Sequence, residues 1–292
     1  MNARSALSIR WRHLFVYERG CLGALCFVGF VVTRYSHVRF QLEWAGKGIR
    51  CSFYDYVVES VSGDGPICCS WFLCVLCACI LATLLSRAER CPQGLLASGS
   101  WRRLCVCNLL DGLAAAFLVA TVEFLFIVFS GAFSVLAAPS AAGGGLCSFC
   151  SGESVYAAKI GAAACAAPSP AAFLVAAFAS LLAASMLGAV VYVLLRWLLG
   201  NNAASLAIVS VLGLTVVQSE YSFVYELFRS FGGSLGLVNP VYAVTSLVSI
   251  HWARWADGGP KGFAAMLALI VAVGCVAVVA APYMRRARRT ME

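Results

Sequence analysis

Charged residues are scarce in this chain. Lys, Arg, Asp and Glu together make up 12% of its 292 residues, whereas apolar residues make up 62%. A soluble domain usually carries about 25% charged residues, and the mean hydropathy here is +0.88. The chain therefore has too few polar side chains to cover a surface that faces water. This composition excludes an ordinary soluble protein and indicates an integral membrane protein.

A phosphate-binding loop of the form G-x-x-x-x-G-K-[ST] is also missing. The sequence AGKGIR around Lys47 has neither the spacing nor the context of such a loop, so the chain is not expected to bind ATP itself. Histidine is rare, and His13, His37 and His251 lie in different segments, whereas a zinc site needs ligands at rigid spacing. No Ser-His-Asp arrangement and no pair of carboxylates is spaced for hydrolysis. We therefore expect no metal site, no catalytic residues and no cofactor in this chain.

Cysteine, in contrast, is abundant, with 15 residues. Most of them lie in or near apolar runs, where cysteine behaves as a small apolar side chain. Cys147 and Cys150 form a C-x-x-C pair within Pro139–Pro170, a segment rich in Ala, Gly and Ser. The pair predicts a disulfide or, as an alternative function, a quinone-linked membrane thiol oxidoreductase. The low-complexity segment offers no framework to tune a thiol, which favours the disulfide.

Six apolar runs are long enough, or nearly so, to cross ~30 Å of hydrocarbon, which takes about 20 helical residues. They predict an all-α membrane protein with short outer interfacial helices and one polytopic domain over residues 1–292. The predicted spans are 14–33, 67–85, 109–137, 171–199, 200–218 and 262–283. We expect the first to be retained instead of being cleaved as a signal peptide. Arg34–Pro66 is expected to form a short amphipathic structure on the outer surface.

The arginines mark one side of these spans. Thirteen of the 21 basic residues, against three acidic ones, fall at the two termini, between the second and third spans and at the end of the fourth. The opposite segments carry eight basic and eight acidic residues. Because Lys and Arg favour the cytoplasmic side, both termini are predicted to be cytoplasmic. The bias toward Ala, Gly and Cys suggests a bacterial cytoplasmic membrane, and the absence of a basic stripe with interleaved aromatics argues against nucleic acid as a partner.

Asp111 and Glu123 are the only acidic residues inside the apolar runs. A carboxyl group in hydrocarbon is costly and indicates a function, such as a substrate path or proton relay, with a buried structural carboxyl as the alternative. Twelve residues separate the two, so on one helix they point about 120° apart. Asp111 is expected near the cytoplasmic interface. Glu123 is expected either to line a central path or to pair with a polar group on a neighbouring helix.

Small residues gather in three stretches, at Gly112–Ala116, Ala177–Gly188 and Gly262–Ala268. Small side chains let membrane helices approach closely. The stretches predict either a dimer seam or opening path, or ordinary packing within one chain, and the sequence does not choose between these.

Two further stretches indicate a family. Residues 86–111, SRAERCPQGLLASGSWRRLCVCNLLD, place Glu89 after the second span and then leucines, small residues, Ser and Arg before the third. Residues 237–248, LVNPVYAVTSLV, place an Asn-Pro element before the last span. Together with six spans and a basic lead-in, these stretches resemble the permease subunit of type-2 ATP-binding-cassette (ABC) exporters. Asn108 and Asp111 stand where that family usually has Lys.

The resemblance implies an exporter subunit that works with a cytoplasmic P-loop ATPase, which binds the ATP and Mg, and with a second permease copy or sister permease in the lipid bilayer. A coupling helix near Gly94–Cys107 would lie along the cytoplasmic interface. A helix from Arg103 to Ala137 would measure about 50 Å, which exceeds the hydrocarbon core and leaves room for such a segment. The implied ATPase contacts are Glu89, Gly94, Ser98, Trp101, Arg102 and Arg103. The alternatives are a loop that only holds topology and, for the whole chain, the thiol oxidoreductase or a non-catalytic membrane scaffold or immunity protein.

Overall fold

The computed structural model describes residues 3–46, 51–62, 70–87, 101–137, 170–200, 203–210, 268, 271–276 and 279. These residues are almost entirely helical, and none of them lies in a strand. The helices with defined bounds are α1 (Ala3–Tyr17), α2 (Arg19–Ala45), α3 (Phe53–Ser62), α4 (Ser70–Arg87), α6 (Trp101–Ala137) and α8 (Pro170–Leu199). The predicted all-α class is confirmed for this part of the chain.

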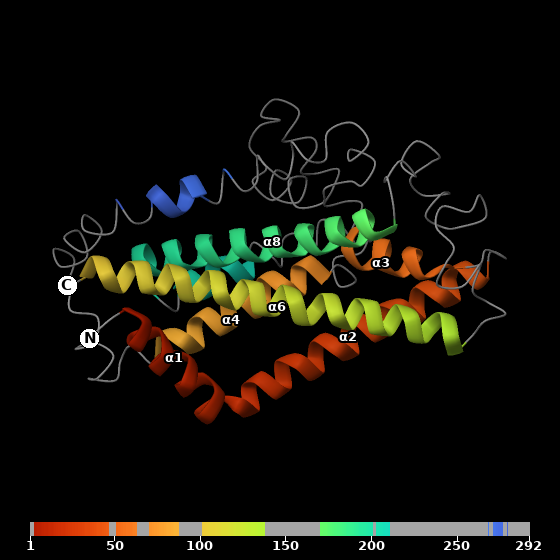
Figure 1. The fold of residues 1–292 in the computed structure, drawn as a ribbon, viewed down its shortest axis with the longest axis horizontal. Coiled ribbons are helices and arrows are strands. Elements are labelled where there is room, and N and C mark those ends of the chain that lie inside the picture. The colour runs from red at the N-terminus through yellow and green to blue at the C-terminus, as the bar shows by residue number, and fades with distance from the viewer. Residues whose placement is uncertain are drawn as a thin grey trace.

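The long helices lie side by side along the longest axis of the molecule, and α6 contacts each of the other five (Figure 1). Helices α2 and α6 run in one direction, whereas α4 and α8 run in the other. The short helix α3 lies at the end where α2 and α6 finish, and it contacts both of them. The largest apolar cluster includes residues of α3, α4, α6 and α8, such as Val57, Cys74, Ile127 and Leu181.

Three helices are long and apolar enough to cross a membrane: Arg19–Ala45, Leu104–Ala137 and Ala177–Leu199. The apolar part of α4, Leu73–Leu85, is shorter. Large apolar side chains such as Phe27 and Phe129 are exposed on the outside of these helices, as expected where lipid replaces water. The chain is therefore a helical membrane-associated protein. Of the predicted spans 200–218 and 262–283, only 203–210, 268, 271–276 and 279 lie within the described residues.

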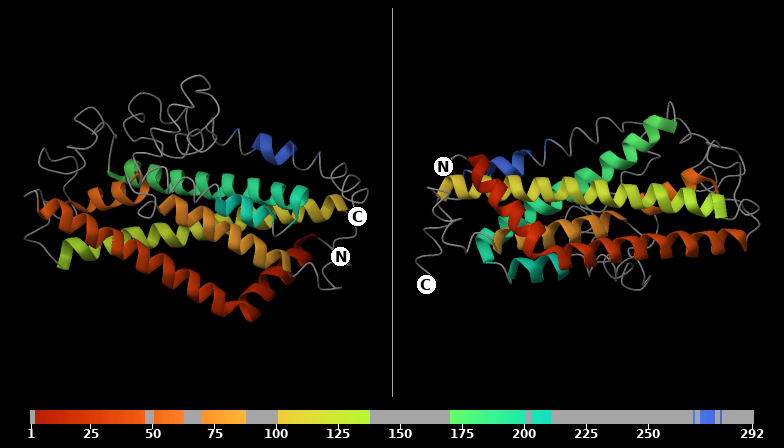
Figure 2. Two further views of the ribbon diagram at one scale, coloured as in Figure 1. Left: turned by 180° about the vertical axis from the view of Figure 1, so that it is seen from behind. Right: turned by 60° about the horizontal axis from the view of Figure 1, so that its bottom comes forward.

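The first span is displaced from its predicted place at 14–33. The chain bends at Glu18, where the backbone has φ −106° and ψ 16°, and α1 meets α2 at a corner (Figure 1 and Figure 2). Helix α2 then continues through Arg34 to Ala45, residues that we expected in an outer segment. Polar residues in this part remain helical because α6 and α3 supply hydrogen-bond partners to them. The other part of the expected outer segment includes the short helix α3.

The start of α6 also differs from the prediction. A coupling helix over Gly94–Cys107 was expected to lie separately along the interface, yet residues 101–107 continue without interruption into the span. The 37 residues of α6 correspond to about 55 Å, well beyond a hydrocarbon core of ~30 Å. Residues 101–107 are therefore part of the same helix as the span. A separate coupling helix could lie only within residues 88–100, which are outside the described residues.

The small residues of α8 serve packing within the chain. A Cβ atom at Gly188 would lie 2.6 Å from Val75 Cγ1 on α4, so only glycine permits this approach. A Cβ atom at Gly112 of α6 would lie 3.3 Å from Val193 Cγ2 on α8. Two of the three small-residue stretches thus bring helices of one chain together, and Gly262–Ala268 lies outside the described residues except for Ala268.

Candidate functional site in an apolar cavity

Helix α6 carries buried polar side chains at three levels, of which the first faces α1 and the other two face α2. Asn108 and Asp111 meet α1, Glu123 meets α2, and Ser130 meets α2 through His37. Apart from its first turn, helix α6 is mostly apolar, so these levels are the places where its buried part forms hydrogen bonds and an ion pair with neighbouring helices.

The first level joins α1 to α6 by an ion pair. Arg10 Nη1 donates to Asp111 Oδ2 at 2.8 Å and to Asn108 Oδ1 at 2.8 Å, while Trp11 Nε1 donates to Asp111 Oδ1 at 3.1 Å. Arg10 is 2% exposed and Asp111 3%. Forming a buried ion pair costs the free energy of desolvating both charges. Removal of one partner is strongly destabilising, because it leaves the other charge buried without a countercharge. Asp111, which we expected at the interface, is therefore a structural tie to the helix that precedes the first span.

The second level holds Glu123 at the edge of a cavity. Thr33 Oγ1 of α2 donates to Glu123 Oε1 at 2.6 Å, and the hydroxyl of Ser70 at the start of α4 is a second hydrogen-bond partner. Gly29 allows this contact, because a Cβ atom there would lie 3.3 Å from Glu123 Oε2. Glu123 thus pairs with a polar group on a neighbouring helix, which is one of the two arrangements that the sequence left open; a place on a central path stays a prediction.

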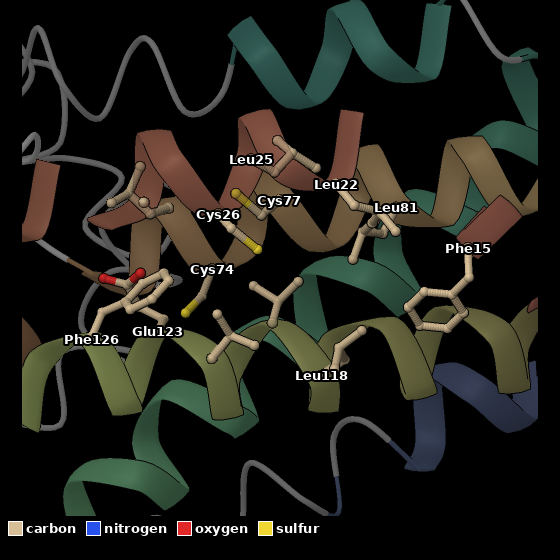
Figure 3. A pocket seen from close by; sticks show the side chains of 14 residues that line it. Phe15, Leu22, Leu25, Cys26, Cys74, Cys77, Leu81, Leu118, Glu123 and Phe126 are labelled. Carbon is tan, nitrogen blue, oxygen red and sulfur yellow. The ribbon is translucent and has the colours of Figure 1, made fainter. Parts of the chain in front are cut away.

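The cavity has a volume of about 240 Å³ and is partly open. Figure 3 shows Glu123 and Phe126 at one end and Phe15 of α1 at the other. Every lining side chain except that of Glu123 is apolar or a thiol. The other lining residues are Leu22, Leu25, Cys26, Gly29, Leu73, Cys74, Cys77, Leu81, Leu118, Val119 and Val122. The Glu123 carboxyl group is buried and accepts a hydrogen bond from Thr33, so the walls that a ligand would contact are almost entirely apolar and suit an apolar ligand.

The third level links α2, α3 and α6 near the other end of the bundle. The buried His37 ring lies 3.0 Å from Ser130 Oγ through Nδ1 and 2.6 Å from Ser60 Oγ through Nε2. Arg34 Nη1 donates to the Ser130 carbonyl at 3.3 Å and also to the Ser134 hydroxyl. This cluster satisfies the polar groups that α2 brings into contact with α6, so we interpret it as structural.

Only some of the predicted site residues lie among those that the structure describes. Asp111 and Glu123 lie at separate levels of α6, as their spacing predicted, and each has its own partner helix. Trp101, Arg102 and Arg103 form the first turn of α6, but their side chains are not among those described. The remaining site residues lie outside the described residues: Glu89, Gly94, Ser98, Cys147 and Cys150.

Several site residues were missed by sequence reasoning. Arg10 was counted as a cytoplasmic topology signal, yet it is buried against Asp111. His37 was missed because the first span was expected to end at Thr33, and Thr33 was missed because it stood at that predicted end. One signal was present in the sequence: Ser130 and Ser134 follow Glu123 by 7 and 11 residues, which places all three within about 20° of one helix face.

Cysteines contribute thiols to the cavity but no recognisable metal centre. Within the described residues, no group of three or more His, Cys, Asp or Glu side chains is arranged to hold a metal ion. Cys26, Cys74 and Cys77 are free thiols that point toward the cavity (Figure 3). Their contribution is a polarisable apolar surface.

Comparison with known proteins adds no relative: no family model, curated protein or solved structure matches this chain. The candidate site is therefore interpreted from its own geometry.

Proposed function

We propose that this chain is the membrane-spanning permease subunit of an ABC exporter, which moves a substrate across the cytoplasmic membrane while a separate subunit hydrolyses ATP. The observation that carries the proposal is the cavity between α1, α2, α4 and α6, with Glu123 as its one acidic residue. A chamber lined by apolar side chains and placed among helices of membrane length is the kind of site that an export substrate needs before it is released.

Helix α6 provides a mechanical link between the proposed cytoplasmic side and this chamber. Its first turn contains Trp101, Arg102 and Arg103, its next turns hold the ion pair to Arg10, and its middle forms a cavity wall. In the proposed mechanism, an ATPase pushes on the first turn and on the preceding residues 88–100. Because α6 is one continuous helix, that push shifts the wall containing Leu118 and Glu123.

The ion pair makes α1 move with α6. Arg10 ties α1 to Asp111 at 2.8 Å, and Phe15, five residues further along α1, closes the cavity at the end away from Glu123. A displacement of the start of α6 therefore moves Phe15 as well. We propose that this motion opens and closes the chamber, and that a second permease copy or sister permease completes the path.

The test is a pull-down of the tagged full chain from its own host in mild detergent, with the recovered partners identified by mass spectrometry. We expect a P-loop ATPase, and we expect its recovery to fall by tenfold or more when Trp101, Arg102 and Arg103 are all changed to alanine. Arg39→Ala is the matched control, because Arg39 is an exposed arginine near the opposite end of α2. This control should retain the ATPase.

Two results would reject the proposal. One is recovery of the folded, monodisperse chain with no ATPase, at expression levels that preserve other membrane complexes. The other is recovery of an ATPase that the triple variant and Arg39→Ala affect equally, because the start of α6 would then have no special part in the contact.

A further inference from the structure

We infer that the cavity holds one acyl chain of a phospholipid, whose head group stays at the membrane interface beside Phe15 while the chain extends toward Phe126. This inference rests on the proposed function and names a lipid as the substrate of the same site. Three features support it: the apolar walls of the cavity, its extent along helices of membrane length and the charged residues near Phe15.

The walls of the cavity offer almost nothing to a polar or charged group. The lining side chains are apolar or thiols except for Glu123, which is 4% exposed and accepts a hydrogen bond from Thr33. The backbone of α2 at Gly29 covers the second carboxyl oxygen, since a Cβ atom there would lie only 3.3 Å from Oε2. An engineered cavity of about 150 Å³ with apolar walls stays dry and binds benzene. At about 240 Å³, this cavity should likewise exclude water and take up hydrocarbon.

The cavity runs along helices of membrane length. Its lining residues on α6 extend from Leu118 to Phe126, which is about 12 Å of helix. Those on α4 cover the same length, from Leu73 to Leu81. The walls formed by α2 and α6 belong to helices that are long and apolar enough to cross a membrane, and Figure 3 shows Phe15 and Phe126 at opposite ends. An elongated apolar cavity among such helices fits an extended hydrocarbon chain, which the surrounding bilayer supplies.

The end of the cavity at Phe15 lies close in sequence to positive charges. Phe15 is 54% exposed although it lines the cavity, so this end reaches the surface. Arg12 and Arg19, both exposed, stand three residues before it and four residues after it. Arginine binds phosphate through its planar group of donors, and basic residues beside a membrane span attract anionic lipids. The phosphate of a lipid therefore has a place beside Phe15, from which its chain enters the cavity.

The experiment uses two photoreactive phosphatidylglycerols in nanodiscs of unlabelled phosphatidylglycerol that contain the purified full chain. One probe carries a diazirine in the middle of an acyl chain, and the other carries it on the head group. After illumination, the labelled residues are identified by mass spectrometry. We expect the chain probe to label Cys77 and Val122, which line the cavity, as strongly as Phe129, which is exposed outside it. The head-group probe should label the segment from Arg12 to Arg19, and it should label Cys77 and Val122 less than the chain probe does, by tenfold or more.

Two tryptophan variants locate the chain. Leu118→Trp fills the cavity, so the chain probe should label Cys77 and Val122 less by tenfold or more. Labelling of Phe129 should stay as it is in the wild type. Leu136→Trp is the matched control, because it makes the same substitution on α6 at a residue that is 69% exposed and outside the cavity. This control should leave the labelling of all three residues unchanged.

The inference is overturned if the chain probe labels Phe129 but neither Cys77 nor Val122, because no lipid chain would then enter the cavity. It is also overturned if the head-group probe labels those two residues equally well, or if a folded Leu118→Trp variant retains their labelling. The comparison of the two probes in the wild type decides the matter even if the variants do not fold. Recovery of the ATPase without labelling in the cavity would reject the lipid alone, whereas labelling in the cavity without an ATPase would reject the proposed exporter alone.

Discussion

Replacement of Gly188 by alanine tests how closely α4 and α8 are packed. The added Cβ atom would lie 2.6 Å from Val75 Cγ1, 3.2 Å from Cγ2 and 3.3 Å from Cβ. Ordinary van der Waals contact between carbon atoms begins near 3.4 Å. Valine cannot turn aside easily, because its branched side chain has one strongly preferred rotamer in a helix. The two helices must therefore separate by a large part of an ångström, or the Val75 side chain must leave its preferred rotamer.

Overpacking of this kind usually costs about 1–3 kcal/mol, and we expect Gly188→Ala to lower the free energy of unfolding by that amount. The assay is unfolding by sodium dodecyl sulfate in mixed micelles, followed by circular dichroism. Val75→Ala removes both of the atoms that lie closest to the new methyl group. The double variant should therefore be more stable than the sum of the two single effects, by about 1 kcal/mol or more.

Gly23→Ala provides the matched control. A Cβ atom at Gly23 meets nothing within 4 Å, so this variant should be as stable as the wild type or more stable by up to about 1 kcal/mol, because alanine favours helix. If Gly188→Ala and Gly23→Ala were equally stable, or if Val75→Ala gave no rescue, the close contact between α4 and α8 would be refuted.

Two further predictions concern buried ionisable groups. Arg10→Met and Asp111→Leu should each lower the free energy of unfolding by about 3–5 kcal/mol, because each leaves the other charge buried without a partner. The double variant should lose clearly less than the sum of the two single effects. Additive effects in the same unfolding assay would refute the ion pair. Burial raises the pKa of the Cys51 thiol from 9.0 to about 12, helped by the negative charges of Asp55 and Glu59. The raised pKa stabilises the fold fully below about pH 9, and this contribution is lost as the pH rises toward 12. Melting temperatures between pH 8 and 11 should thus fall more steeply in the wild type than in Cys51→Ala, and parallel curves would contradict the burial of this thiol.

The candidate site was predictable in part. Glu123 could be singled out because a carboxyl group in an apolar run is rare and costly, and its separation from Asp111 around the helix followed from 100° per residue. The partners could not be predicted. Thr33 and Arg10 are 90 and 101 residues away from Glu123 and Asp111, and no local pattern in one sequence specifies a pairing over such distances.

The ends of the helices were also predictable only in part. The apolar run of α8 predicted its extent well, since hydrophobicity alone marks a helix surrounded by lipid or apolar neighbours. For α2 the predicted end at Thr33 was wrong because polar residues follow it. The free-energy cost of burying those residues in a helix depends on whether another helix supplies hydrogen-bond partners. His37 remains in the helix because Ser130 and Ser60 lie beside it.

The sequence by itself determined that this is a helical membrane protein, because 12% charged residues cannot cover a surface in water, and its periodicity separated the two carboxyl groups on α6. Only the tertiary structure decided what those groups do. Packing of α1 against the start of α6 neutralised Asp111 with Arg10, whereas packing of α2 and α4 around Glu123 supplied hydroxyl groups and an apolar cavity. The physical reason is that the energy of a buried charge depends on its nearest neighbours, and those neighbours are brought together only when distant helices pack.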